Sequence, residues 1–273
     1  MDSFDYVVVG GGAAGSLLAA RLSEAGRHNV CVLEAGPPDS NRYIRIPAGF
    51  MKTIFDPEVT FQYHCEPIEG TAGRKVPIIQ GRTIGGGGSV NGMLIVRGQP
   101  GDYDTWAARG NPGWRYAEVL PYFKRTERWL GDGDDRYRGR DGALPVTRPT
   151  YANALAEAFM DSAAACGMPR HDRSGVDYNG PVQLGTGRYQ AAILNARRVS
   201  SAHAFLHPAR RRGEIDVRAS AHASRIRFDG RRATGVDYLD SAGGAHSVGA
   251  RLAVVVAAGA VNSPKLLQLS GVG

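Results

Sequence analysis

Three glycines and one glutamate near the N-terminus have the spacing of a site for phosphate and ribose. Gly10, Gly12 and Gly15 lie close together in the sequence. Two apolar runs follow them, and Glu34 stands at the end of the second run. In such a turn the glycines permit a tight bend, close approach of a pyrophosphate, and close packing of the following helix. A carboxylate at this distance accepts hydrogen bonds from ribose hydroxyl groups and repels a 2′-phosphate. The pattern predicts dinucleotide binding and argues against NADP.

The segments around the glycines predict the elements that position them. Residues 5–9 form an apolar run typical of a buried parallel strand, residues 16–25 have helical apolar spacing, and residues 29–33 indicate a second strand. The turn would then lie at the N-terminus of the helix, where free N–H groups and the helix dipole bind phosphate. A chance turn in a chain with 37 glycines is the alternative, but it leaves the strand–helix–strand unit unexplained. This unit does not distinguish FAD from NAD.

A second glycine-rich segment covers residues 81–98. Glycine inside a helix or strand costs about 1 kcal/mol relative to alanine, so we expect neither element here. The composition suits a backbone wrapped closely around a flat ligand, and it suits a flexible surface loop equally well. The residues alone leave both interpretations open.

Residues 81–98 and 259–273 resemble two signature segments of the glucose-methanol-choline (GMC) family, flavoprotein oxidoreductases that oxidise alcohols. The resemblance extends along nearly the whole chain and is closest to the bacterial choline-dehydrogenase-like members. The shorter similar segments are residues 102–106, 110–114, 120–123, 177–180 and 197–201.

The resemblance implies an α/β fold. Its main part would be a Rossmann-like FAD-binding fold, with a parallel sheet, helices on both faces and a small antiparallel sheet, followed by part of a second, substrate-binding domain. The predicted FAD-binding domain comprises residues 1–150 and a truncated second part, residues 215–273. Residues 151–214 are assigned to the partial substrate-binding domain.

The resemblance also assigns parts of FAD to particular residues. Gly85 and Gly86 would approach the flavin and the diphosphate, and residues 91–93 would lie against the isoalloxazine ring. The backbone of Ala223 would contact adenine, and residues 258–259 would lie near the adenosine ribose. The complete set of predicted cofactor-binding residues is Gly10, Gly12, Ala13, Ala14, Gly15, Glu34, Ala35, Arg82, Gly85, Gly86, Asn91, Gly92, Met93, Ala223, Ala258 and Gly259.

Two departures from the family pattern concern the flavin. Gly87 and Gly88 stand where many members have two serines, and we expect them to loosen the loop and weaken flavin binding. Val90 stands where some relatives carry a histidine that bonds covalently to the flavin. Because valine cannot form this bond, FAD is expected to bind non-covalently.

No catalytic residue is predicted within the chain. The resemblance places the catalytic histidine, and the histidine or asparagine that holds the substrate oxygen, beyond Gly273. In the intact family that histidine removes the hydroxyl proton of the alcohol while a hydride passes to flavin N5. The substrate is therefore expected to be a small-molecule alcohol.

Two functions stay open on these grounds. The chain is either the FAD-binding half of an FAD-dependent, choline-like alcohol dehydrogenase, inactive alone, or a non-catalytic flavin- or nucleotide-binding module or fragment that needs a separate second half. An NAD-dependent dehydrogenase is the weakest alternative, because it does not explain residues 81–98.

Composition excludes several other classes. The net charge is +7, but the basic residues are scattered and no aromatic stripe lies among them, so nucleic-acid binding is not expected. Cys31, Cys65 and Cys166 are far apart, without metal or redox spacing, which favours a reducing, cytoplasmic setting. The N-terminus lacks a signal-peptide pattern, and the longest apolar run, residues 252–261, is about half of a membrane span. We expect a soluble protein without a transmembrane segment.

Two of the seven histidines, His203 and His207, have the i, i+4 spacing of metal ligands on a helix. The pair lacks the flanking acid of a zinc helix, and Pro208 follows it directly. We therefore expect no metal, and exposed or capping roles for both side chains.

The remaining segments predict structural elements. Trp106, Trp114 and Trp129 are interpreted as packing residues in the core or at an interface. The resemblance places the last strand beside the first. The predicted elements are helices over residues 116–129 and 151–166, a surface loop over residues 131–141, antiparallel strands over residues 214–217, 224–228 and 233–238 with a turn at residues 229–230, a buried strand over residues 251–257, and a helix that starts at residues 263–264.

Overall fold

The computed structural model describes residues 2–151, 153–171, 177–213 and 215–273. They form two compact units. The first unit combines the segment that ends at Gly92 with Ala196–Gly273, and the second unit is Met93–Asn195. The domains predicted from the sequence differ from these units because they were defined by the ligand that each part would bind. The predicted domain boundaries therefore stay a prediction.

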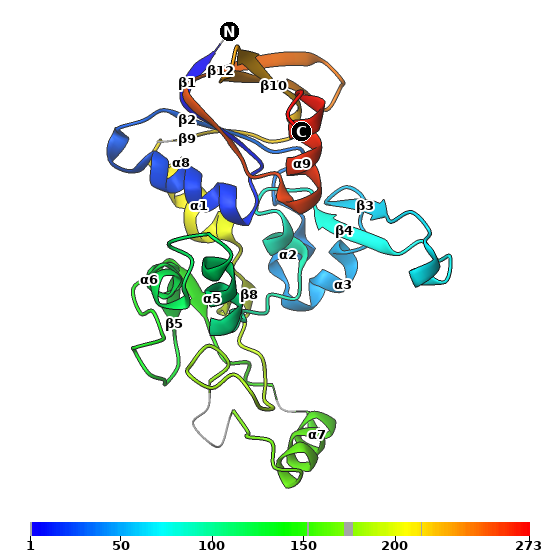
Figure 1. Cartoon of the computed structure of the whole chain (residues 1–273), viewed down its shortest axis with the longest axis vertical. Helices are drawn as coiled ribbons and strands as arrows, with labels where there is room; N and C mark the ends of the chain where they lie inside the picture. Colours follow the sequence, from blue (N-terminus) through cyan, green and yellow to red (C-terminus); the bar gives the residue numbers. More distant parts are fainter. Residues whose placement is uncertain (1, 152, 172–176, 214) are drawn as a thin grey trace. The chain divides into compact units, whose positions relative to one another are not determined.

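The first unit is built around a six-stranded sheet with the order β10-β11-β12-β1-β2-β9 (Figure 1). The strands β12, β1, β2 and β9 are parallel neighbours, whereas β10, β11 and β12 are antiparallel neighbours. Their bounds are β1 Ser3–Val9, β2 Val30–Leu33, β9 Ile215–Arg218, β10 His222–Asp229, β11 Arg232–Leu239 and β12 Ala245–Val256.

Helices cover both faces of this sheet because β1 and β2 are apolar without alternation. Val7 and Val9 belong to a buried cluster that includes Leu266 of α9 (Gly259–Leu269). Val8 points to the opposite face, where it lies against Gly15 of α1 (Ala13–Leu22). The predicted α/β class is confirmed.

Most of the strand predictions hold in this sheet. The strands predicted over residues 5–9 and 29–33 correspond to the parallel neighbours β1 and β2, and β12 runs parallel beside β1, as the resemblance implied. The predicted turn at residues 229–230 joins β10 to β11, where Gly230 has a φ of 56°.

The predicted direction of one strand is wrong. Residue 214 is not described, but residues 215–218 form β9, which pairs parallel with β2 rather than in an antiparallel sheet. A short apolar run identifies a strand but not its direction, because direction depends on the path of the chain before it.

The last helix also begins earlier than predicted. It starts at Gly259, whose φ of 87° favours glycine, so Pro264 lies inside α9. Proline cannot donate a hydrogen bond to the carbonyl four residues before it. That carbonyl belongs to Ala260, which is exposed, so water can replace the missing donor.

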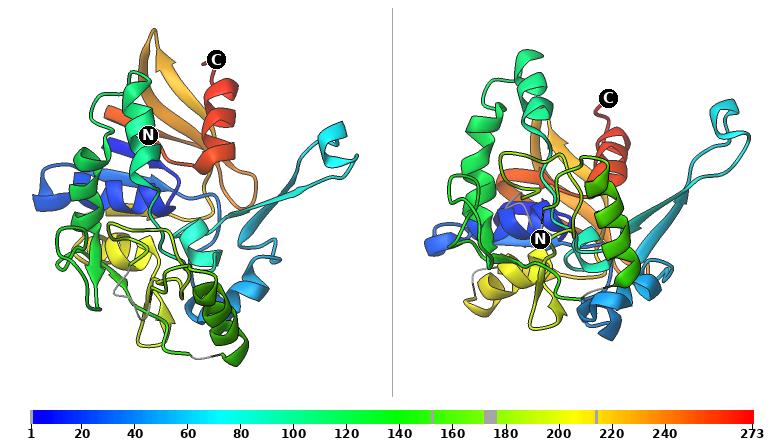
Figure 2. Two further views of the ribbon diagram at one scale, coloured as in Figure 1. Left: turned by 60° about the horizontal axis from the view of Figure 1, so that its bottom comes forward. Right: turned by 90° about the horizontal axis from the view of Figure 1, so that it is seen from below.

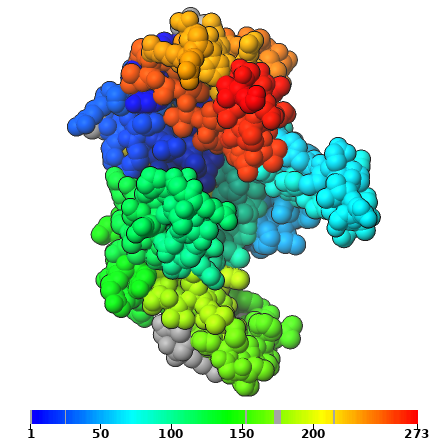
Figure 3. All heavy atoms as spheres, in the orientation of Figure 1, coloured from blue at the N-terminus to red at the C-terminus, as the bar shows by residue number. Residues whose placement is uncertain are grey.

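A hairpin of the first unit, β3 (Thr60–His64) paired with β4 (Pro77–Gly81), extends away from the central sheet (Figures 2 and 3). The base of the hairpin reaches the carboxyl ends of the sheet strands, where the site described below lies. The other short elements of this unit are η1 Glu24–Gly26, α2 Arg42–Arg45, η2 Pro47–Gly49, α3 Phe50–Thr53, η3 Glu69–Thr71, α4 Gly87–Val90, β8 Arg197–Arg198, η4 Ala202–Leu206 and α8 His207–Arg211.

The second unit contains two of the predicted helices with shorter bounds. The helix predicted over residues 116–129 ends at Thr126, and the next three residues form a strand. The helix predicted over residues 151–166 is Ala154–Ala165, and residue 152 is not described. The elements are α5 Pro100–Ala108, α6 Tyr116–Thr126, β5 Glu127–Trp129, β6 Leu144–Val146, α7 Ala154–Ala165 and β7 Ile193–Leu194.

The predicted surface loop over residues 131–141 contains a buried arginine, which corrects that prediction. Arg138 stacks on the ring of Trp129 at 4.0 Å and forms ion pairs with Glu127 at 3.1 Å and Asp177 at 3.6 Å. The two carboxylates compensate the buried charge.

Of the three tryptophans predicted to pack in the core or at an interface, one lies in the core. Trp129 is 2% exposed, whereas Trp106 and Trp114 are 47% and 48% exposed. The latter two pack edge to face with ring centroids 5.5 Å apart.

Candidate functional site

A cavity of about 790 Å³ lies in the first unit at the carboxyl ends of its parallel strands. This is the position at which open α/β sheets bind ligands, and the volume suits a small molecule or cofactor. Eleven of the sixteen predicted cofactor-binding residues line it: Gly10, Gly12, Ala13, Ala14, Glu34, Ala35, Gly86, Asn91, Ala223, Ala258 and Gly259.

The first glycine turn depends on three positions without side chains. Gly10 has a φ of 100°, and a Cβ there would lie 2.4 Å from the carbonyl oxygen of Ala257. A Cβ on Gly15 would lie 1.9 Å from the carbonyl oxygen of Gly10. A Cβ on Gly12 would meet nothing closer than 3.7 Å and would enter the cavity. Gly10 and Gly15 therefore allow the turn, and Gly12 leaves room for a ligand.

The second glycine segment packs directly against the first. The N–H of Gly85 donates to the carbonyl of Gly11 at 2.8 Å. A Cβ on Gly86 would lie 2.7 Å from the Cα of Gly12. The segment is also more regular than predicted, because Gly81 ends β4 and residues 87–90 form one helical turn, α4. The two segments form one wall of the cavity.

Glu34 follows β2 and is 5% exposed. Its carboxylate accepts the N–H of Gly11 at 2.8 Å and the N–H of Gly36 at 2.9 Å. Burial raises the pKa of Glu34 to about 7, although these two donors and nearby Arg82 favour the ionised form. Each oxygen keeps acceptor capacity for a further donor, such as a ribose hydroxyl.

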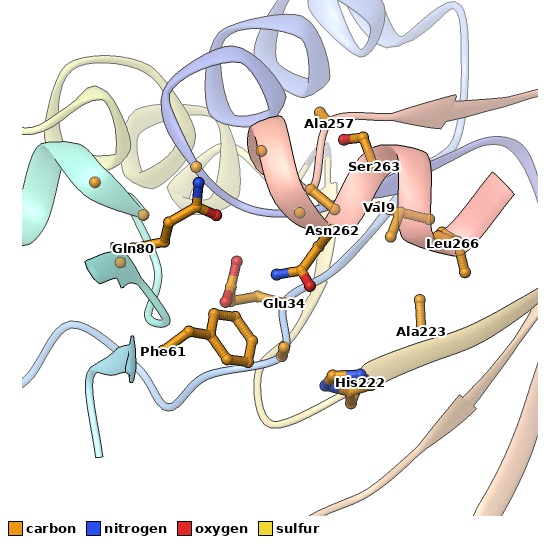
Figure 4. Close-up of a pocket in the computed structure, with 18 of the residues that line it drawn as sticks. Val9, Glu34, Phe61, Gln80, His222, Ala223, Ala257, Asn262, Ser263 and Leu266 are labelled. Carbon is orange, nitrogen blue, oxygen red and sulfur yellow. The ribbon is translucent and has the colours of Figure 1, made fainter. Parts of the chain in front are cut away.

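Polar and aromatic side chains that the sequence analysis did not select also line the cavity. Phe61 and Gln80 come from β3 and β4, and Asn262 comes from α9. The side chains of Phe61 and Asn262 lie beside Glu34 (Figure 4), whereas Oε1 of Gln80 lies near Gly259. The hydroxyl of Tyr63 donates to Oδ1 of Asn262 at 2.9 Å, which holds that amide in place. The sequence analysis made no prediction for residues 60–64, and nothing in these residues indicates a position beside Glu34.

His222 begins β10 and lines the cavity beside Ala223. Burial, and then the charges of Lys265 and Arg82, lower the pKa of His222 below its usual value. The imidazole is therefore mainly neutral at neutral pH.

Arg198 supports the second glycine segment from behind. It is fully buried, and burial lowers its pKa to about 10. It donates to the carbonyls of Ile44 at 2.8 Å and Gly88 at 3.1 Å, and to Oδ1 of Asn91 at 3.0 Å. The family-like segment 197–201 contains this arginine, but only the structure gives it a positioning role.

Five predicted residues do not line the cavity. Gly15 and Gly85 pack behind its wall, and Gly92 follows Asn91. Arg82 lies over the ring of Phe61, with its guanidinium carbon 5.6 Å from the centroid. Met93 belongs to the second unit and has a φ of 63°, which is rare for a residue with a side chain. Direct cofactor contact stays a prediction for all five.

The parallel sheet, the glycine turn before α1 and the carboxylate after β2 define a nucleotide-binding α/β fold. Residues 4–273 match the family described as GMC oxidoreductase, in its N-terminal region. The chain belongs to the GMC oxidoreductase family.

Curated relatives agree with this assignment. The chain is 40% identical over 276 residues to an oxygen-dependent choline dehydrogenase of Staphylococcus saprophyticus, covering 100% of this chain and 48% of the relative. It is 37% identical over 273 residues to the oxygen-dependent choline dehydrogenase of Photobacterium profundum, covering 99% of this chain and 47% of the relative. The chain thus spans about half the length of these relatives.

Solved structures share the fold. Pyridoxine 4-oxidase from Mesorbium loti matches with a TM-score of 0.91 and 33% identity, over 98% of this chain and 52% of that structure. An FAD-dependent oxidoreductase from Chaetomium thermophilum matches with a TM-score of 0.89 and 31% identity, over 99% of this chain and 48% of that structure. Within the described part of the chain, no helix is both long and apolar enough to cross a bilayer.

Proposed function

We propose that the cavity binds FAD non-covalently and that the chain is the FAD-binding part of an oxidoreductase acting on the CH–OH group of an alcohol. The observation that supports this most is the joint wall of the two glycine segments, with Gly12 open to the cavity and Glu34 at its end. A side chain on Gly12 would occupy space that a bound diphosphate needs, and a side chain on Gly86 would clash with the backbone of Gly12.

Each part of FAD has matching groups in the cavity. The uncapped N-terminus of α1 offers backbone N–H groups to the diphosphate, and the carboxylate of Glu34 accepts from the adenosine ribose. Asn91, whose Oδ1 accepts a hydrogen bond from Arg198, is proposed to contact the flavin ring. Val90 lines the cavity without a nucleophilic atom, which supports non-covalent binding.

Bound FAD would supply the hydride acceptor of the reaction. The contribution of these residues is to hold the cofactor and to exclude water from its diphosphate. An alcohol of the choline class is proposed as substrate because the curated relatives above are named choline dehydrogenases. We propose that the groups that move the substrate proton lie beyond residue 273, so the chain alone binds cofactor without turning over alcohol. The setting proposed for the protein is cytoplasmic.

The test uses the purified chain, incubated with FAD and freed of unbound cofactor. A flavin absorbance band that stays with folded protein and passes into the acid supernatant on precipitation supports the proposal. Gly12→Leu is expected to abolish retention, because its side chain fills the cavity. Gly70→Ala is the matched control, since a Cβ there meets no atom closer than 3.9 Å.

Absence of retained flavin with folded wild-type chain would contradict the proposal for this chain. Flavin that stays in the protein pellet after acid treatment would contradict the non-covalent attachment. Turnover of choline by the chain with an artificial electron acceptor would contradict the proposed position of the proton-transfer groups.

A further inference from the structure

Asp39, His203 and His207 bring three metal-ligating side chains together in the first unit. Nε2 of His207 lies 2.9 Å from Oδ2 of Asp39, and Nδ1 of His203 lies 3.5 Å from the same oxygen. No two of the three ligand atoms are more than 4.8 Å apart. Among the residues that the structure describes, this is the one group of three or more such side chains with this spacing.

The helical geometry explains why the two histidines face one oxygen. His203 lies in η4, a turn of π-helix, and His207 begins α8 directly after it. Side chains four residues apart then lie on one face, and the two rings meet edge to face with centroids 5.0 Å apart. Asp39 reaches them from the loop after β2, a short way beyond Glu34. The acid missing from the helix is supplied from a distant part of the sequence.

We propose that Asp39, His203 and His207 bind a divalent transition-metal ion such as Zn²⁺ or Co²⁺. At metal–ligand distances of about 2.0–2.2 Å, ligand atoms around such an ion are separated by roughly 2.9–3.5 Å. The two separations to Asp39 Oδ2 already lie in this range. Two imidazoles and one carboxylate are a common set for ions of this kind, with water completing the coordination.

The surroundings select the class of ion. Arg45 and Arg211 add positive charge near the cluster and oppose any cation held by charge alone. Ions such as Mg²⁺ and Ca²⁺ prefer oxygen ligands and are disfavoured by two imidazoles. Ions with strong affinity for imidazole nitrogen are the ones that can overcome this repulsion.

A bound ion would tie the helical segment to the loop after β2. The same segment abuts the proposed cofactor wall, because Ser201 Oγ donates to the Gly12 carbonyl at 3.4 Å and Ser200 lies against Gly85. Ser200 Oγ also lies 3.0 Å from Nδ1 of His203 and would have to give way to the ion. Metal binding is thus expected to raise the melting temperature of the chain without any cofactor.

The test measures Co²⁺ and Zn²⁺ binding to the full chain prepared without a histidine tag. Cys65→Ser and Cys166→Ser form the background, because Cys166 is exposed and Cys65 is half-buried, so both thiols can bind metal by themselves. We expect one ion per chain, a visible Co²⁺ spectrum without thiolate bands, and a higher melting temperature with Zn²⁺. Asp39→Asn and His203→Gln are each expected to weaken binding more than about 100-fold, beyond the loss typical of an outer-sphere change.

His246→Gln is the matched control, since His246 pairs with Asp240 at 2.7 Å but belongs to no group of three metal-ligating side chains among the residues that the structure describes. It should leave affinity unchanged. Circular dichroism establishes that each variant is folded. Wild-type chain that binds neither ion at micromolar concentration, or Asp39→Asn and His203→Gln variants that keep wild-type affinity, would overturn the proposal.

Discussion

The pKa of Glu34 predicts that FAD affinity depends on pH. The ionised carboxylate is the form that accepts hydrogen bonds from both ribose hydroxyl groups, whereas the protonated form loses acceptor capacity. Because burial raises the pKa of Glu34 to about 7, the free chain must release a proton from this group before it binds ribose at lower pH. Affinity should therefore rise with pH through this value.

The expected size follows from the ionised fraction. About one tenth of the Glu34 carboxyl groups are ionised at pH 6 and about nine tenths at pH 8, so the dissociation constant of FAD should fall roughly ten-fold between them. The pKa of His222 is lowered below its usual value by burial, so His222 contributes less to the slope than an unshifted histidine would. Flavin fluorescence titration at constant ionic strength measures the constants.

The variant Glu34→Gln removes the titration. Affinity at pH 8 should fall about 10- to 150-fold, which corresponds to one charge-assisted hydrogen bond of about 1.5–3 kcal/mol, and it should no longer change with pH. The amide of the variant would also turn an N–H₂ donor toward the N–H donor of Gly11 or Gly36, which is unfavourable. Folding of the variant is therefore checked separately. Wild-type affinity that is constant from pH 6 to 8, or a variant with the same rise, would refute the assigned contact.

Three other experiments test packing and burial inside each unit separately. Gly15→Ala should lower the free energy of unfolding by about 3 kcal/mol in urea titration, because its Cβ would lie 1.9 Å from a carbonyl oxygen, whereas Gly70→Ala should change it by less than about 0.5 kcal/mol. Arg138→Met should cost about 3–5 kcal/mol in the same assay, because it leaves two carboxylates buried without this cation; a neutral effect would show that they relax to solvent. In native protein a disulfide reagent should react with Cys166 and not with Cys31, whose pKa burial raises to about 12; reaction of Cys31 before unfolding would contradict its burial.

The parts of the site that lie close in sequence were predictable. The turn from Gly10 to Gly15 and the carboxylate of Glu34 belong to one strand–helix–strand unit, so local periodicity and spacing were sufficient. The position of β12 beside β1 followed from the family resemblance alone, since no local pattern specifies a partner strand near the opposite end of the chain.

The rest of the site depends on contacts that a single sequence does not encode locally. Phe61 and Asn262 meet near Glu34 only because a hairpin and the last helix converge there. In the same way Asp39 and His203 are far apart in the sequence and meet only in the fold, so the histidine spacing alone predicted no ligand set. Arg138 was assigned to the surface because charge usually indicates exposure, and its compensating carboxylates come from other segments.

The pairing of β1 with β12 has a consequence for synthesis on the ribosome. Val9 is paired with Val256, so the first strand is made long before its neighbour. At about 5–20 residues per second, synthesis of the intervening chain takes roughly 12–50 s. During that interval β1 has one unpaired edge and an apolar face without α9, which makes the nascent chain a substrate for chaperones that shield exposed strands.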